Sequence, residues 1–202
     1  NDVFFQKNDL GEKIRKLYRI PQEKGIVLYA PTYRSMSEDD FERYRPDWER
    51  ILASFRERFG KEYVVVYKLH HYMQKLVSEK GLYEQAVEAT FYPDMQELLV
   101  AADIVITDYS SLMWDFSLQR RPVFLYQNGV EQYTNDRGFY APVSEWPYPK
   151  AHSEEELIGQ IRCFDEEKYI TELNAFLEKY GSCDDGHASE RVVKRILDVI
   201  AV

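Results

Sequence analysis

Short apolar runs alternate with segments of helical periodicity over the first 126 residues. Runs rich in β-branched and aromatic residues predict strands at 25–30, 63–69, 88–92, 103–107 and 122–126. Segments whose apolar residues recur every three or four positions predict helices at 10–20, 47–59, 72–80, 94–102 and 110–119. Strands that alternate with helices in this way predict an α/β fold, a Rossmann-like parallel sheet flanked by helices.

The C-terminal part of the chain, from about residue 153, shows only helical patterns and predicts a helical wrap around the α/β unit. No internal repeat, low-complexity tract or linker divides the chain, so we expect residues 1–202 to form a single α/β domain. The chain begins with Asn1, and its first residues resemble the end of a loop. We therefore expect it to be a piece of a longer protein.

The composition is that of a globular domain with a net charge of −9. This acidity argues against a nucleic-acid-binding platform and against direct attraction to anionic lipid. No apolar run approaches the roughly 18 to 20 residues of a membrane-spanning helix. Cys163 and Cys183 have no metal-ligand spacing, which favours reduced thiols in an intracellular protein. We expect neither a metal nor a cofactor.

Polar and basic residues follow the predicted strands at their carboxyl ends, where open α/β sheets bind ligands. They are Thr32 and Arg34 after the first strand, Lys68, His70 and His71 after the second, Asp108, Ser110 and Ser111 after the fourth, and Arg137 after the fifth. A phosphate can be bound by the guanidinium groups of arginine, by serine hydroxyls and by the N-terminus of the helix at 110–119. Alternatively, Ser110 is an ordinary helix cap, Lys68 a solvated strand end and Arg34 part of an ion pair.

No glycine-rich phosphate loop occurs, which disfavours a P-loop ATPase and a simple dinucleotide oxidoreductase. His70 could donate to a phosphate or move a proton, or it could be structural. Asp115 lies one helical turn after Ser111 and could accept a hydrogen bond from a sugar or polyol hydroxyl. Alternatively, Asp115 is a first-turn acid that suits the helix dipole.

Several stretches occur in a familiar order: APTYR, YKLHH, FYPDMQELLVAADIVITDYSSLMWDFSLQRRPVFLY, YTNDRGFY and CDDGHASERVV. Together they resemble the C-terminal half of the CDP-glycerol glycerophosphotransferases, the teichoic acid primases and polymerases of bacterial cell walls. The resemblance covers essentially all 202 residues, and its most specific part is 91–126. It implies the C-terminal, nucleotide-donor-binding lobe of a two-lobed GT-B fold, without the N-terminal lobe.

The resemblance also implies roles for individual residues. Ser110 and Ser111 would hold the donor phosphates, and the loop at 92–95 would lie near the cytosine. His70 would assist departure of the phosphate. The other residues expected to bind the donor are Thr32, Arg34, Lys68, Asp108, Asp115, Arg137 and Gly138.

The function implied is transfer of glycerol phosphate, or a related alditol phosphate, from a CDP-activated donor to a teichoic-acid-type polymer or a lipid-linked acceptor. The full-length protein would be cytoplasmic and peripheral at the inner face of the cell membrane. Two departures from the family pattern leave alternatives open: His71 replaces the proline of a His-Pro pair, and Tyr148 replaces a glycine. The alternatives are a GT-B glycosyltransferase that uses a CMP- or UDP-sugar and a non-catalytic domain with a degenerate site.

Overall fold

The computed structural model describes residues 1–7, 9–32, 46–70, 86–127, 139 and 141–200. In this part of the chain six parallel strands form one sheet in the order β3-β2-β1-β4-β5-β6. The strands are β1 (Gly25–Tyr29), β2 (Tyr63–Tyr67), β3 (Val87–Glu88), β4 (Ile104–Thr107), β5 (Val123–Tyr126) and β6 (Lys150–Ala151). The predicted parallel α/β sheet is confirmed, and β6 is an addition to the five predicted strands.

The central strands are nearly continuous apolar runs, as expected for strands that helices cover on both faces of the sheet. Every residue of β1 and β4 is buried, and in β2 only Val64 is partly exposed. Val27 of β1 lies opposite Val65 of β2 on one side and opposite Ile104 of β4 on the other. A continuous β-branched run in the sequence therefore becomes the middle of the core.

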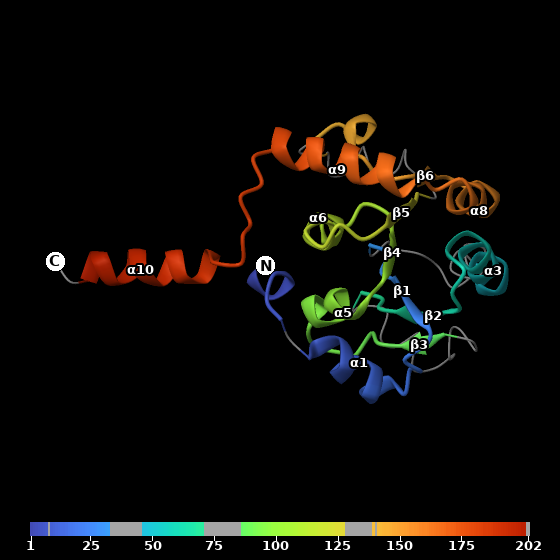
Figure 1. Ribbon diagram of the computed structural model, residues 1–202, viewed down its shortest axis with the longest axis horizontal. Coiled ribbons are helices and arrows are strands. Elements are labelled where there is room, and N and C mark those ends of the chain that lie inside the picture. The colour runs from blue at the N-terminus through green and yellow to red at the C-terminus, as the bar shows by residue number, and fades with distance from the viewer. Residues whose placement is uncertain (8, 33–45, 71–85, 128–138, 140, 201–202) are drawn as a thin grey trace.

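The helices lie in layers on the two faces of the sheet. They are α1 (Leu10–Tyr18), α3 (Trp48–Phe59), α5 (Met95–Ala101), α6 (Leu112–Ser117), α8 (Glu154–Arg162), α9 (Glu166–Lys179) and α10 (Ala188–Ile200), with 3-10 turns η1 (Asp2–Phe4) and η3 (Val143–Glu145). Helix α1 packs against α5 on one face and α3 packs against α8 on the other (Figure 1). None of the helices in the described ranges is long and apolar enough to cross a membrane.

Two of the predicted helices show how the sequence specifies a buried face and a helix start. In α3, Trp48, Ile51 and Phe55 are buried, as their spacing predicts. Helix α5 begins at the predicted cap, since the Asp94 carboxylate accepts hydrogen bonds from the N–H groups of Gln96 at 2.8 Å and Glu97 at 3.3 Å. The helix predicted at 72–80 lies outside the described residues.

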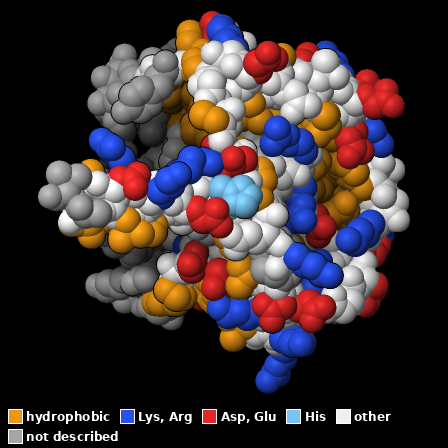
Figure 2. Space-filling model, turned by 60° about the vertical axis from the view of Figure 1, so that its left-hand side comes forward, with side chains coloured by type: hydrophobic (Ala, Val, Ile, Leu, Met, Phe, Trp, Pro, Cys, Tyr) orange, Lys and Arg blue, Asp and Glu red, His pale blue; other side chains and the backbone are white. Residues whose placement is uncertain are grey.

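The C-terminal helices divide into two groups. Helices α8 and α9 lie along the β5–β6 side of the sheet, whereas α10 extends away from the body (Figure 1). Hydrophobic side chains gather along one side of α10 (Figure 2), and the aliphatic ones that are each more than half exposed are Val192, Val193, Ile196, Leu197, Val199 and Ile200. Within the described ranges, the helical wrap therefore ends before α10.

The first turn of α10 is bound to the N-terminal segment. The Asp2 carboxylate accepts hydrogen bonds from the N–H groups of Ala188 at 3.0 Å and Ser189 at 2.8 Å. The neighbouring Gly186 has φ +83° and lies against Phe5, so that a Cβ at this position would come within 2.7 Å of the Phe5 Cβ. Asp2 thus acts as the cap that joins the two ends of the described chain.

This cap predicts an unusual titration. The hydrogen bonds from Ser189 and Ala188 lower the pKa of Asp2 from its ordinary value of 3.8 to about 2. A lowered carboxyl pKa stabilises the folded contact above pH 4, and the contact is lost as the pH falls through about 2. We expect the backbone amide resonance of Ser189 to titrate with a midpoint near 2 and to lose this titration in Asp2→Asn. A midpoint near 4 would contradict the cap.

Candidate functional site

The order of strands reverses between β1 and β4, because β2 and β3 lie on one side of β1 and β5 and β6 lie beyond β4. The loops that leave two such strands diverge, and the crevice between them is where open α/β sheets bind ligands. The loop after β1 carries Thr32, and the loop after β4 carries Asp108, Ser110 and Ser111. Four predicted site residues therefore lie at the switch point of the sheet.

Asp108 joins the two sides of this crevice. Its carboxylate accepts hydrogen bonds from the N–H of Thr32 at 2.9 Å, the Thr32 hydroxyl at 2.8 Å and the N–H of Tyr109 at 2.6 Å. Only 2% of Asp108 is exposed, and it does not line the cleft described below. The contacts indicate that Asp108 positions Thr32 opposite the serine pair.

The serine pair begins helix α6. Ser111 is the N-cap residue of α6, but its side chain makes no capping hydrogen bond. The Ser110 Oγ accepts a long hydrogen bond of 3.5 Å from the N–H of Leu112. Helix α6 is shorter than predicted, Leu112–Ser117 instead of 110–119, so its macrodipole is correspondingly weaker. The hydroxyl groups and nearby N–H groups are the main features available to hold an anion.

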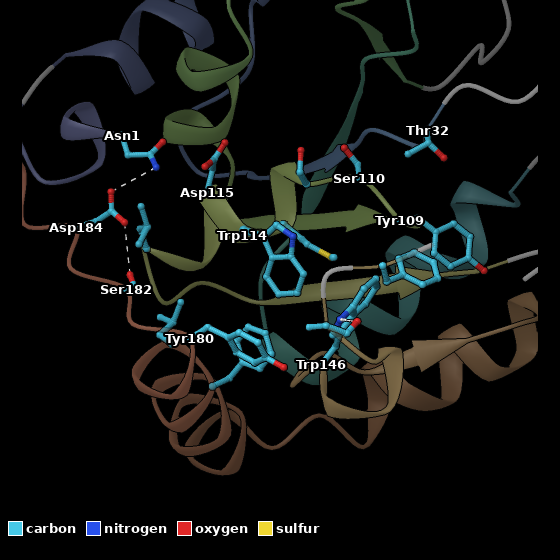
Figure 3. Close-up of a pocket in the computed structure, with 17 residues that line it drawn as sticks. Asn1, Thr32, Tyr109, Ser110, Trp114, Asp115, Trp146, Tyr180, Ser182 and Asp184 are labelled. Carbon is cyan, nitrogen blue, oxygen red and sulfur yellow. Dashed lines mark hydrogen bonds between the residues drawn. The ribbon is translucent and has the colours of Figure 1, made fainter. Parts of the chain in front are cut away.

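A cleft of about 550 Å³ opens beside the serine pair. Four of the predicted site residues line it: Thr32, Ser110, Ser111 and Asp115 (Figure 3). Asp115 is half-buried, and this burial raises the pKa of its carboxyl, although a hydrogen bond with Asn1 opposes the change. The structure therefore brings the two serines and a carboxylate to one cavity.

The far wall of the cleft is aromatic. The Trp114 indole stacks on Phe176 of α9 with 5.1 Å between ring centroids and 7° between planes. Trp146 meets Trp114 edge-on at 5.3 Å and Phe139 at 5.2 Å. The Tyr180 ring lies 4.6 Å from Phe176 and is 45% exposed. Aromatic residues make up 15% of the chain, but the segments that supply these rings lie far apart in the sequence, so the composition alone does not predict the cluster.

Lys68 and His70 lie at the end of β2 and do not line this cleft. The Lys68 ammonium donates hydrogen bonds to the carbonyl oxygens of Thr90, at 3.2 Å, and Tyr92. Burial lowers the pKa of Lys68. Lys68 therefore fixes the loop between β3 and α5, the loop that the family resemblance places near the cytosine. His70 is half-buried.

Tyr148, which departs from the family pattern, is part of the core. It is 2% exposed, and its hydroxyl lies 2.8 Å from the Ser117 hydroxyl on α6. Burial raises the pKa of this phenol. Tyr148 is absent from the residues that line the cleft, so in the structure it supports α6 from behind.

The remaining predicted residues lie outside the described ranges: Arg34, His71, Arg137 and Gly138. Within those ranges, no group of three or more His, Cys, Asp or Glu side chains is arranged to hold a metal ion.

The Asp108 contacts predict a graded loss of stability. Asp108→Ala leaves the partly buried N–H of Thr32 and the buried N–H of Tyr109 without their acceptor, so we expect the free energy of unfolding to fall by about 3 kcal/mol. In Asp108→Asn the amide oxygen can still accept from both N–H groups while its NH₂ donates to the Thr32 hydroxyl, and we expect a loss of about 1 kcal/mol. Urea unfolding measures both values, and equal losses would contradict the proposed geometry.

Comparison with known proteins gives several matches over nearly the whole chain. A teichoic acid poly(glycerol phosphate) polymerase of Bacillus subtilis is 33% identical over 207 residues, which cover 95% of this chain and 27% of that protein. A teichoic acid ribitol-phosphate primase of Bacillus spizizenii is 29% identical, over 95% of this chain and 49% of that protein. The chain thus spans between about a quarter and a half of the length of these relatives.

A solved structure supports the same relationship. The wall teichoic acid polymerase TagF, in a variant soaked with CDPG, matches 98% of this chain and 47% of its own with a TM-score of 0.74 and 26% identity. The fold is therefore that of about half of this GT-B polymerase. A model of the CDP-glycerol:poly(glycerophosphate) glycerophosphotransferase family matches residues 1–198. The chain belongs to this family.

Proposed function

We propose that this chain is the C-terminal, donor-binding lobe of a transferase that moves glycerol phosphate, or a related alditol phosphate, from a CDP-activated donor to a teichoic-acid-type acceptor. One observation carries the proposal: in a member of this family, Thr32, Ser110, Ser111 and Asp115 line one cleft beside the switch point of the sheet. The named relatives include both a glycerol phosphate polymerase and a ribitol phosphate primase. The alditol therefore stays open between glycerol and ribitol.

The donor diphosphate would lie at the serine pair, with the hydroxyls of Ser110 and Ser111 donating to its oxygens. Arg34 and Arg137 would add charge, and Lys68 would act indirectly by holding the loop that faces the base. The Asp115 carboxylate lies one turn along α6 and would accept a hydrogen bond from an alditol hydroxyl.

The reaction would be a displacement at phosphorus. An acceptor hydroxyl attacks the β-phosphorus, the bond between this phosphorus and the bridging oxygen breaks, and CMP departs. The departing phosphate gains negative charge, which the serine hydroxyls and the arginines would stabilise. As the family resemblance implies, His70 would donate to the departing phosphate, from the end of β2 and outside the lining of the cleft. The base that takes the proton of the acceptor hydroxyl would come from the other lobe.

The site of action follows from this reaction. A CDP-activated donor is a cytoplasmic metabolite, and a lipid-linked acceptor is held at a bilayer. The full-length protein would therefore work at the inner face of the cell membrane.

Calorimetric titration with CDP-glycerol, CDP, CMP and UDP tests the proposal. We expect cytidine-selective binding that is at least about 100-fold weaker in the double variant Ser110→Ala with Ser111→Ala, because two hydrogen bonds to charged oxygens are lost. Ser144→Ala, which changes an exposed serine of η3, is the matched control and should bind like the unchanged protein.

Other outcomes would contradict the proposal in different ways. UDP binding as tight as CDP binding would favour a glycosyltransferase lobe with another nucleotide-sugar donor. The absence of binding to every nucleotide, in a protein whose unfolding is cooperative, would favour a non-catalytic domain.

A further inference from the structure

The cleft extends well beyond the place proposed for the phosphates. Its lining follows α6 from Ser110 and Ser111 to Leu118 and ends at Ser182 and Asp184, which follow α9 (Figure 3). The seven steps from Ser111 to Leu118, at a helical rise of about 1.5 Å each, correspond to about 10 Å. A three-carbon alditol attached to a phosphate at the serines would fill only the near end. The far end therefore has room for a second, larger group.

The charge of this far end disfavours a phosphate, because carboxylates lie there and the hydroxyls of the serine pair do not. Asp184 contributes a carboxylate at this end, and Asp115 contributes a second one between Asp184 and the serine pair (Figure 3), while no Lys or Arg is among the described residues that line the cleft. Like charges in a partly buried cavity repel, so an anionic polymer unit is disfavoured there. The carboxylates and the Ser182 hydroxyl, which lies 3.5 Å from Asp184, can instead accept hydrogen bonds from hydroxyl groups.

The walls of the far end are large aromatic surfaces. Trp114 and Tyr180 line it, and Tyr180 is 45% exposed, whereas Trp146 lies on the Tyr109 side of the cleft (Figure 3). A saccharide ring has an apolar face of C–H groups and a rim of hydroxyls, so it can cover an aromatic wall while its hydroxyls reach the carboxylates. A linear alditol offers a much smaller apolar face.

We propose that the aromatic end of this cleft binds an uncharged saccharide unit of the acceptor. Its assignment to the acceptor rests on the proposed function, whereas the kind of ligand follows from the cleft itself. The saccharide unit lies between α6 and α9, with its ring against Tyr180 and Trp114 and its hydroxyls directed to Asp184. The acceptor is thereby held beside the serine pair and the donor.

The chain has three tryptophans, which allow a sharp test. Trp114 and Trp146 line the cleft, whereas Trp48 lies outside its lining, in α3, and packs on Tyr29. The probes are cellobiose and chitobiose as uncharged disaccharides, with glycerol and ribitol as alditols. We expect the disaccharides to shift the indole N–H resonance of Trp114 saturably, to shift that of Trp146 less, because it is only 4% exposed and meets Trp114 edge-on, and to leave that of Trp48 unchanged.

Variants connect the response to the cleft. Tyr180→Ala removes an exposed ring and should raise the apparent Kd for the disaccharide by roughly three- to tenfold. Leu17→Ala, an exposed truncation on α1 outside the cleft lining, is the control and should leave that Kd unchanged. Asp184→Asn keeps the shape of the side chain and should weaken binding by a smaller factor.

Three results would overturn the inference: no shift in the unchanged protein, an equal shift of all three indoles, or an unchanged Kd in Tyr180→Ala. Alditols that bind as tightly as the disaccharides would also overturn it, because the far end would then hold the donor alditol. The double serine variant distinguishes this inference from the proposed function. It should lose CDP binding and keep the disaccharide response, so either one can fail while the other stands.

Discussion

The buried carboxylate of Asp108 is the interaction on which the site depends. Two loops that leave a parallel sheet at its switch point diverge, and nothing in the sheet itself holds them in a fixed relation. Asp108 binds the backbone and hydroxyl of Thr32 while also accepting from Tyr109 in its own loop. A buried carboxylate is costly unless its oxygens are well satisfied, so this arrangement stabilises one geometry of the crevice. Ser110 and Ser111 come directly after this anchored segment in the sequence, so Asp108 also positions the serine pair.

The loops on either side of the crevice are held by different means. On the β3 side, the Lys68 ammonium joins two carbonyl groups of one loop, which compensates for its partial removal from water. On the β5 side, the support is mainly aromatic packing around Trp114. In addition, the Ser117 hydroxyl hydrogen-bonds to the Tyr148 hydroxyl and to the carbonyl oxygen of Met113. Helix α6 has only six residues, so its position depends on this packing more than on its own helical hydrogen bonds.

The sequence predicted the repeating architecture well because its signals are local and periodic. The buried run that became β2 and the cap at Asp94 are examples, and the serine pair was placed correctly at the carboxyl end of β4. Strand β6 has two residues, too few to show any period. The role of Lys68 depends on which groups the ammonium at the end of its long, flexible side chain contacts. The hydrogen bond between Asp108 and Thr32 joins positions that are 76 residues apart. No local pattern encodes such contacts.

The sequence did not predict the position of α10 either, for a different physical reason. An amphipathic pattern shows that a helix has one apolar face, but it does not show what covers that face. In the described part of the chain, α10 is bound through its first turn to Asp2, and Asn1 beside it hydrogen-bonds to Asp184 at 3.4 Å. Asn1 and Asp184 both line the cleft. The far end of the cleft is therefore built where Asn1 meets the segment that follows α9, whereas its near end is built by the loops that leave the sheet. The near end is supported by the buried core, while the shape of the far end depends on the few polar contacts that join Asn1 to Asp184 and Asp2 to the first turn of α10.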